Sequence, residues 1–408
     1  LNTTLYLAGN YFRFIEQQHE PAGRTYFISA VGRDNLLTDL FAFVQAGATE
    51  AQLIDFLNDR HQVGQDDAID YVNELINCQL LVFELEPTLT GDAHLTVFAE
   101  RLSTLVAFPA VINARRVLTR INELLTHRPL ALNALPPYLA EQGIALPHTD
   151  FIQIDTALPA DTCQLSERWL DHFQQQLNAL LVLNRPYKNN ALDEFRHRFY
   201  LRYEAEEVPL AFALDHEMGV GYGDTSTLGV GNAPMLDTLS LSGIAKDQDA
   251  TLTNWQLFVL DRYTEALRYG RSEIVLTDDD LGKVGNPQEA MRTLPSSFYA
   301  FGTLLSSSAD SIDRDDYLFS LTSCLGPSAV NLLSRFGEAD PALAEQLKQC
   351  ARLEEASHPD VILAEIVHSP EARAGNICHR PTLYQYEIPY LGRASVASEY
   401  QIPLSDLY

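Results

Sequence analysis

The sequence has little cysteine and no long apolar run, and each shortage excludes a class of protein. Five cysteines are scattered over 408 residues and no Cys-x-x-Cys pair occurs. Neither a disulfide framework nor a zinc knuckle is therefore predicted. No uninterrupted apolar run is long enough to cross a bilayer, and the N-terminus lacks the basic-then-apolar pattern of a signal peptide. We expect a cytoplasmic protein with no membrane span.

Basic residues are also scarce: 28 Lys and Arg stand against 55 Asp and Glu, which gives a net charge of -27. This balance argues against broad, sequence-independent binding of nucleic acid, which needs a basic face. A local stripe of basic residues is still compatible with this negative net charge. The two candidate clusters are Arg115, Arg116, Arg120 and Arg128, and Arg196, His197, Arg198 and Arg202. For the first cluster a solvated basic face is the favoured interpretation.

Length and composition indicate a soluble globular protein with more than one subdomain. Hydrophobic residues make up 46% of the chain and charged residues 20%, as in ordinary globular proteins. A chain of 408 residues exceeds what one hydrophobic core usually serves, so two or three subdomains are expected. Strand and helix patterns occur in every part of the chain, which predicts the α+β class.

The first 86 residues have the pattern of a compact module. Gly9 and Asn10 form a hairpin turn signal, and Thr49 followed by Gln52 predicts a capping box at the start of a helix. The expected order is strands at 5–7, 11–15 and 24–29, helices at 35–45, 49–61 and 66–77, and a strand at 80–85. Because this order is typical of winged-helix modules, we predict one over residues 1–86.

The rest of the chain is predicted to form a mainly helical connecting subdomain at 87–190 and a mixed region at 191–408. Acidic residues 278–280 could suggest a Mg²⁺ site, but a solvated helix cap is the favoured interpretation, and no metal site is predicted. The expected helices are 93–104, 111–126, 135–142, 166–183 and 255–270, and the expected strands are 151–155, 274–277, 298–305 and 317–322.

The most informative stretch is residues 195–223. Phe199, Leu201 and Tyr203 alternate with charged residues, which predicts a half-buried strand or extended segment. A strand-like apolar run at 208–214 then ends on Asp215, and glycines follow at alternate positions from 219 to 223. An acidic residue at the lip of an apolar segment, before a permissive loop, is a common way to build a site. A helix end stopped by glycines explains the pattern equally well.

Three motifs in this order resemble those of the lantibiotic (lanthipeptide) dehydratases. The first motif resembles their pattern of Phe, Arg-Tyr, Val-Pro-Leu, Leu-Asp, Glu and Gly-hydrophobic-Gly-Tyr. The second motif resembles their Arg-x-Gly-Asn-Ile-x-x-Arg-Pro segment, and the third resembles their Ile-Pro-Leu-x-Asp-Leu. The matching residues are Phe199, Arg202-Tyr203, Val208-Pro209-Leu210, Leu214-Asp215, Glu217 and Gly219-Val220-Gly221-Tyr222; then Arg373, Gly375-Asn376-Ile377 and Arg380-Pro381; then Ile402-Pro403-Leu404-Ser405-Asp406-Leu407.

The resemblance implies a tRNA-dependent glutamyl transferase without a cofactor. Such enzymes move glutamate from glutamyl-tRNA, as co-substrate, to Ser and Thr of a precursor peptide, and a later domain eliminates it to leave dehydroalanine or dehydrobutyrine. Transfer needs a group that orients or deprotonates the hydroxyl and cations that bind carboxylate and oxyanion. Residues 191–408 are then part of the glutamylation domain. The predicted catalytic residues are Asp215 and Arg373, and the weaker substrate or tRNA contacts are Arg202, Arg335, Asn376 and Arg380.

The resemblance also implies that the winged-helix module recognises the leader of the precursor peptide. The leader is expected to add a strand to an open sheet edge and to insert apolar side chains beside a helix. DNA binding is disfavoured because helix 66–77 carries acidic residues and no basic one. The expected groove is lined by Ile69, Val72, Leu75, Ile76, Leu81 and Phe83, of which some must be core.

The chain departs from the family pattern in one respect, because the Arg-Ser-Thr-Pro-Phe-Gly motif of these enzymes is not found. We therefore expect a fragment that is inactive alone. A non-catalytic peptide-binding or scaffold protein stays open as the alternative, as does a metal-dependent hydrolase using Asp215 and His216. A homodimer and a cyclase are further partners that the resemblance leaves open.

Overall fold

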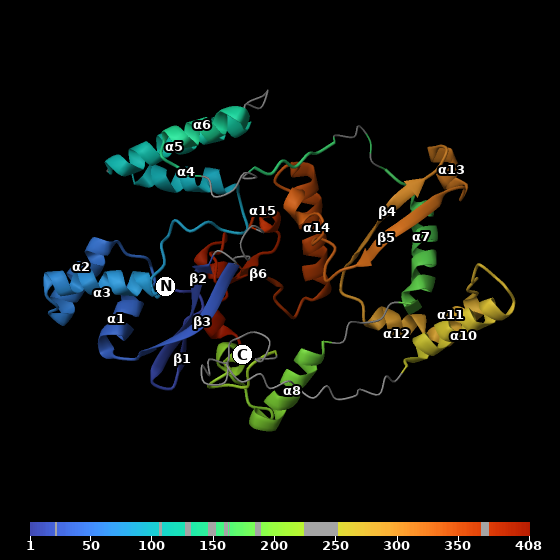
Figure 1. Ribbon diagram of the computed structural model, residues 1–408, viewed down its shortest axis with the longest axis horizontal. Coiled ribbons are helices and arrows are strands. Elements are labelled where there is room, and N and C mark those ends of the chain that lie inside the picture. Colours follow the sequence, from blue (N-terminus) through green and yellow to red (C-terminus); the bar gives the residue numbers. More distant parts are fainter. Residues whose placement is uncertain are drawn as a thin grey trace. The chain divides into compact units, whose positions relative to one another are not determined.

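The computed structural model describes residues 1–20, 23–105, 108–126, 132–145, 152–158, 162, 164–183, 189–223, 252–368 and 375–408. These residues form a mixed α+β protein with many helices and three small sheets (Figure 1), and the predicted class is confirmed. The chain divides into two compact units. The first is Leu1–Ala157, Ala191–Gly223 and Leu333–Tyr408, and the second is Leu158–Asn190 and Asp224–Leu332. The predicted boundaries at 86 and 190 stay predictions.

The first unit begins with an antiparallel sheet in the order β1-β2-β3. Its strands are β1 (Tyr6–Ala8), β2 (Tyr11–Glu20) and β3 (Gly23–Gly32). Gly9 occupies the β1–β2 turn with φ +60°, a conformation that costs glycine nothing. The predicted hairpin and third strand are confirmed.

Three helices follow the sheet and bury one apolar face each against it. They are α1 (Asn35–Val44), α2 (Glu50–His61) and α3 (Gln65–Asn77), and the capping box of Thr49 and Gln52 is present. Leu40, Leu57 and Val72 are fully buried in a shared core that also contains Phe14 of β2. The helices predicted from periodicity are confirmed within two residues at each end.

The strand predicted at 80–85 is wrong. Leu80 and Leu81 are buried in the core, but their backbone groups bond outside any sheet: Leu81 N–H donates to the Leu75 carbonyl at 3.0 Å, and the Leu80 carbonyl accepts from Asn2 N–H at 3.0 Å. Because the end of α3 and the N-terminal residue Asn2 take these two groups, no sheet ladder forms there. The closing strand of the expected winged-helix order is therefore absent from the described residues.

A helical region follows in the same unit. It contains α4 (His94–Thr104), α5 (Pro109–Thr126) and α6 (Leu135–Glu141), as predicted. The strand expected at 151–155 is not formed by residues 152–155, which lie in irregular backbone, and Phe151 lies outside the described residues.

The same unit also contains two helices from the motif region, α8 (Asn190–Tyr203) and α9 (Leu210–Leu214). The strand predicted around 199–203 is wrong, because Phe199 and Tyr203 lie one helical turn apart with ring centroids 5.0 Å apart. The apolar run before Asp215 is likewise a short helix rather than a strand. The remaining elements are α14 (Pro341–Ser357), α15 (Gly375–Cys378) and a parallel pair, β6 (Ala364–His368) and β7 (Tyr386–Tyr390).

The second unit pairs β4 (Tyr299–Leu305) with β5 (Leu318–Leu325) in antiparallel register, as predicted. Phe173 of α7 (Glu167–Leu180) packs against Phe319 of β5, with ring centroids 4.9 Å apart. The other helices are α10 (Asn254–Arg268), α11 (Asp278–Val284), α12 (Pro287–Arg292) and α13 (Ala309–Asp313).

The acidic residues 278–280 form the first turn of α11. The Thr277 hydroxyl accepts from the Asp280 N–H, and the Asp280 side chain accepts from the Thr277 N–H. The predicted helix cap is confirmed. The strand predicted at 274–277 is wrong, since this extended segment pairs with no other strand among the described residues.

No helix in the described part of the chain is long and apolar enough to cross a membrane. The four cysteines that the structure describes are free thiols.

Candidate functional site

Asp215, at the end of α9, is the centre of a buried polar network. Its side chain is completely enclosed, with 0% of its surface exposed. Oδ1 accepts from the backbone N–H groups of Glu217 at 2.8 Å and Met218 at 3.1 Å. Oδ2 accepts from the Tyr6 hydroxyl at 2.6 Å and lies 3.0 Å from Nε of Arg13. Every oxygen of this carboxylate is therefore engaged, which is what a buried charge requires.

Tyr6 and Arg13 reach the carboxylate together because they face each other across the β1–β2 ladder. Directly opposed residues of an antiparallel pair point to the same side of the sheet. Arg13 also donates to Glu217 at 2.6 Å, so one guanidinium joins two carboxylates of the same turn. The hairpin signal at Gly9-Asn10 thus fixes the register that brings this pair together.

The pKa directions agree with the geometry. Burial, then the hydrogen bond to Asp215, raises the pKa of Tyr6 well above its usual value. Burial opposes the charge on Arg13, but the hydrogen bond to Glu217 and the charge of Asp215 outweigh it and raise the pKa of Arg13. Both partners therefore keep their protons at neutral pH, the phenol as a donor and the guanidinium as a cation.

Two glycines of the first motif are required by close approach. A Cβ at Gly219 would lie 2.0 Å from the carbonyl oxygen of Phe212, far inside contact distance. Gly221 has φ +72°, and a Cβ there would lie 2.2 Å from Nδ1 of His216. The N–H groups of Val220 and Gly221 both donate to the Ala213 carbonyl. The Gly-x-Gly spacing therefore lets residues 216–221 fold back onto α9.

Two arginines of α8 brace the same turn from outside. Arg202 donates to the carbonyls of Gly219 and, at 2.9 Å, Met218. Arg198, one helical turn earlier, donates to the Gly221 carbonyl at 3.2 Å. Arg202, predicted as a substrate or tRNA contact, thus binds backbone carbonyls of the first motif.

The third motif packs on the first. Leu404 is buried with Tyr6, Ala8 and Ala211 in a small apolar cluster. The Leu210 N–H donates to the Leu407 carbonyl at 2.8 Å. Residues that are far apart in sequence thus surround β1, and the first and third motifs form one folded site.

The second motif is described from Gly375 onward. Arg373 lies outside the described residues, and so does the side chain of Asn376. Arg380 donates to the Glu365 carboxylate and, at 2.7 Å, to the Cys378 carbonyl. Burial raises the pKa of Glu365, and the charge of Arg380 opposes this rise. The Arg380 guanidinium therefore stabilises the C-terminal end of the helix α15.

The neighbouring His379 is anchored on the other side. It is buried, and its Nδ1 lies 3.0 Å from a carboxylate oxygen of Glu338. Its ring meets that of His94 edge to face, with centroids 4.3 Å apart. Burial, then the charge of His379, lowers the pKa of His94. This side-chain pair ties the start of α4 to the second motif.

Arg335 does not join the Asp215 network. Its guanidinium lies 3.1 Å from Asp155 and stacks over the Phe336 ring at 4.7 Å. Among the predicted polar residues, the structure thus brings Asp215 and Arg202 together at one turn, while Arg380 and Arg335 have other carboxylate partners.

Sequence reasoning missed several functional-site neighbours. Tyr6 and Arg13 complete the Asp215 network, and Glu338 and Glu365 anchor the second motif. Glu387 is also fully buried and accepts from the N–H and hydroxyl of Ser395. The sequence gives one signal for these residues: each is a charged or phenolic residue among apolar neighbours in a strand or loop. That signal does not identify the residue with which each one pairs.

Comparisons with known proteins agree with the motifs. The sequence model of one family, described as lantibiotic dehydratase, N terminus, matches residues 1–408. The chain belongs to the lantibiotic dehydratase family. A comparison with curated proteins finds no relative.

The fold of this family member is similar to a solved structure. The crystal structure of the tRNA dependent lantibiotic dehydratase MibB from Microbispora sp. 107891 superposes with a TM-score of 0.72 at 18% sequence identity. The match covers 99% of this chain and 39% of the MibB chain. The chain thus spans well under half the length of that relative.

The six residues predicted to line a leader groove differ in accessibility. Val72, Leu75 and Leu81 are buried in the core of the first three helices, and Ile69 and Ile76 are partly buried against it. Phe83 is 64% exposed. Three of the six are therefore core, and the surface available to a peptide is formed by the others.

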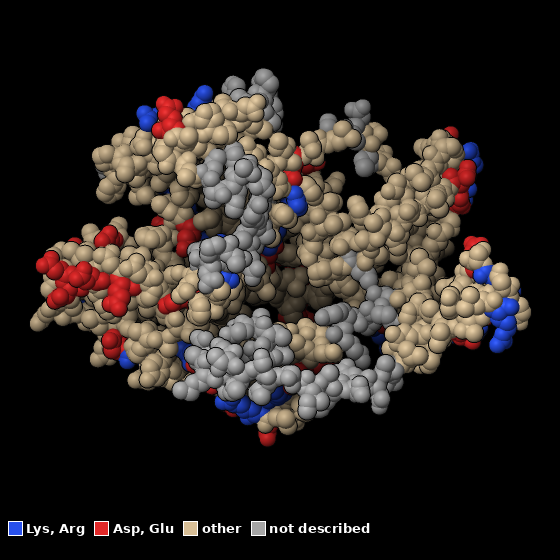
Figure 2. Space-filling view, viewed as in Figure 1, with Lys and Arg blue, Asp and Glu red and all other residues tan. Residues whose placement is uncertain are grey.

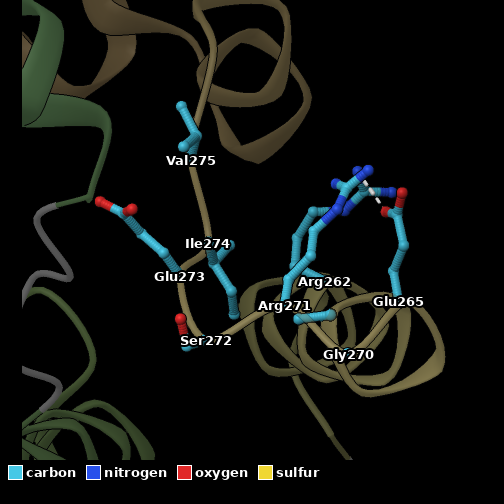
Figure 3. Close-up of a pocket in the computed structure, with 9 residues that line it drawn as sticks. Arg262, Glu265, Gly270, Arg271, Ser272, Glu273, Ile274 and Val275 are labelled. Atoms are coloured by element: carbon cyan, nitrogen blue, oxygen red, sulfur yellow. Dashed lines mark ion pairs between the residues drawn. The ribbon is translucent and has the colours of Figure 1, made fainter.

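A cavity of about 500 Å³ lies in the second unit (Figure 3). Arg262 and Glu265 form an ion pair of 2.9 Å at its wall, and Glu273 points away from them. It is lined by Arg262, Glu265, Ala266, Gly270, Arg271, Ser272, Glu273, Ile274 and Val275. None of the predicted site residues lines it. In the described part of the chain, no group of three His, Cys, Asp or Glu side chains is arranged to bind a metal.

Proposed function

We propose that this chain is the part of a lantibiotic dehydratase that transfers glutamate from glutamyl-tRNA to Ser and Thr of a precursor peptide, in the cytoplasm, before glutamate is eliminated. The observation that carries the proposal is the match of the family's N-terminal model to residues 1–408. The likeness in fold to a tRNA dependent dehydratase supports it. The Asp215 network adds a physical reason why the family motifs recur together.

Asp215 acts in this proposal as a positioning residue. A catalytic base needs a lone pair that can reach the substrate hydroxyl. The two oxygens of Asp215 are instead occupied by two backbone N–H groups, Tyr6 and Arg13, and no part of the side chain is exposed. The carboxylate fixes the turn at 216–222, whose outward groups then meet the substrates.

Cations for the glutamyl carboxylate come, in this proposal, from the second motif. Arg373 is the proposed contact to glutamate or to the tRNA 3′ end, with Asn376 beside it, and the support for both is the motif alone. Arg380 is proposed to orient that motif through Glu365, and Arg202 to orient the first motif. Arg335 remains a proposed tRNA contact, supported by its place in the family pattern.

The leader of the precursor peptide is proposed to add a strand to β3 in a winged-helix-like module. In the described residues β3, ten residues long, pairs with β2 and with no further strand. Long open edges are unusual unless another strand covers them. Ile69, Ile76 and Phe83 supply accessible apolar surface in the same module. This mode of recognition is β-augmentation.

The test is transfer of labelled glutamate from glutamyl-tRNA to a precursor peptide by the intact protein that contains this chain. A glutamyl ester on Ser or Thr, lost on mild alkaline treatment, is the expected result. Saturable binding of the peptide without any ester would contradict the transferase proposal and favour the non-catalytic peptide-binding alternative. An ester that forms equally without tRNA would overturn the assignment of the co-substrate.

A further inference from the structure

The two basic clusters of the sequence differ in what their guanidinium groups bind. On α8, Arg198 and Arg202 donate to carbonyls of the first motif, so they are already engaged within the fold. Arg196, His197 and Arg202 of that cluster are exposed, and Arg196 lies 3.9 Å from Asp193. Two of the three arginines of the α8 cluster therefore already brace the turn.

The α5 cluster is arranged differently. Arg116 is exposed and donates to Asn113, and Arg120 is 53% exposed beside Glu123, the single acidic residue of the helix. No carboxylate in the described part of the chain pairs with Arg115 or Arg116. Helical spacing puts Arg115, which is partly buried, opposite the buried Val117 and Leu124, and it puts the exposed Arg116 and Arg120 on the flank between the two faces.

Two large apolar side chains border the same face. Phe108, just before α5, is 61% exposed, and Ile112, one turn further on, is 58% exposed. Arg115 and Arg116 follow one turn after Ile112, so the outer face reads aromatic, aliphatic, then basic along the helix axis. Guanidinium groups bind phosphate oxygens in pairs, and an exposed ring can stack on a base.

We propose that the outer face of α5, formed by Phe108, Ile112, Arg115, Arg116 and Arg120, binds the backbone of the tRNA co-substrate. The inference rests on the proposed function. In a chain of net charge -27, RNA must bind where positive charge is concentrated locally. Figure 2 shows acidic side chains gathered over α2 and α3, whereas Lys and Arg appear next to Asp and Glu at the place of α5 and also near α8.

The experiment measures binding of transcribed tRNA-Glu to the full chain by fluorescence anisotropy at several KCl concentrations. The test variant is Arg115→Gln/Arg116→Gln/Arg120→Gln, in which glutamine keeps the helix propensity. The matched control is Arg33→Gln/Arg60→Gln/Arg268→Gln, which removes the same charge from exposed arginines elsewhere. Circular dichroism checks that both variants are folded.

The proposal predicts that the test variant binds at least tenfold more weakly at about 100 mM salt and that the slope of log K against log salt falls by roughly 2 to 3, about one for each phosphate contact. The control keeps at least half of the affinity. Equal binding by test and control variants would overturn the α5 surface while leaving the transferase intact. No binding by the unsubstituted chain would overturn the surface, and absence of tRNA-dependent transfer would separately overturn the function.

Discussion

The phenolic oxygen of Tyr6 lies 2.6 Å from Oδ2 of Asp215, a residue 209 positions further along the chain. This bond joins the N-terminal hairpin to the family motif that ends in Gly-Val-Gly-Tyr. Arg13 adds a charge on the same oxygen from the opposite strand. The hairpin and the motif turn therefore stabilise each other, and removing either side chain of the pair should destabilise both segments.

Removing the phenolic hydroxyl should destabilise the first unit. Tyr6→Phe leaves a buried carboxylate oxygen with one donor fewer, which costs about 1–3 kcal/mol of the free energy of unfolding. Tyr11→Phe, at an exposed tyrosine of the same hairpin, is the control and should change it by less than about 0.5 kcal/mol. Urea denaturation measures both. Equal stability of the two variants would contradict the role of Tyr6.

The two carboxylates that contact Arg13 should differ in importance. Arg13→Met leaves Asp215 buried without its cation and should cost about 3–5 kcal/mol. Glu217→Gln removes a partner whose side chain is 75% exposed, so the change should stay below about 1 kcal/mol. Thermal unfolding of the two variants measures both losses of stability. A Glu217→Gln variant as unstable as Arg13→Met would show that the exposed pair, not the buried one, fixes the turn.

Glycine 219 should not tolerate a methyl group. Gly219→Ala would press Cβ against the Phe212 carbonyl, and relieving the overlap should cost at least about 1–3 kcal/mol. Gly32→Ala is the matched control, because no atom lies within 4 Å of its Cβ position. The comparison is again made by urea denaturation. If both substitutions have the same effect, close approach does not explain the motif glycine.

The His94–His379 contact predicts a dependence of stability on pH. The pKa of His94 is lowered below its ordinary value of 6.5, so the unfolded state binds its proton more readily than the folded state. The stability contributed by neutral His94 is then complete above about pH 6.5 and falls as the pH drops below it. Substitution His94→Gln should flatten the unfolding free energy between about pH 5 and pH 7. A wild-type slope retained by the variant would exclude His94 as its source.

Leader binding should depend on Phe83 rather than on Val72. Phe83→Ser changes an exposed ring and should weaken leader binding without unfolding the module, whereas Val72→Asp buries a charge in the core and should unfold it. Leu353→Ser, at another exposed apolar side chain, is the control for both. Anisotropy of a labelled leader peptide and circular dichroism give the two readings. Unchanged binding by Phe83→Ser would remove this residue from the groove.

Local signals predicted much of the fold. The helices around Leu40, Leu57 and Val72 were predictable because a 3.6-residue period and the cap at Thr49 agree with the tertiary packing. The segments 80–85 and 199–203 were mispredicted because apolar content alone does not say where backbone hydrogen bonds go. At 80–85 the end of α3 and Asn2 take the backbone groups of Leu81 and Leu80. At 199–203 a helix forms, and the rings of Phe199 and Tyr203 meet along it.

The site was less predictable than the fold. Asp215 stood out because a charge follows an apolar run, and its neighbouring glycines followed from the motif. Its partners Tyr6 and Arg13 could not be foreseen, because their contact depends on hairpin register and on a helix end more than two hundred residues later. Pairs of this kind are a property of the tertiary structure.

The most direct test of the positioning role is the pH profile of glutamate transfer by Asp215→Asn in the intact protein, measured with its unfolding free energy. The account predicts slower transfer at every pH with an unchanged profile, in proportion to the lost stability, and the same behaviour in Tyr6→Phe. An Asp215→Asn protein that keeps its stability, loses transfer and changes the pH profile would contradict it, because Asp215 would then carry the proton itself.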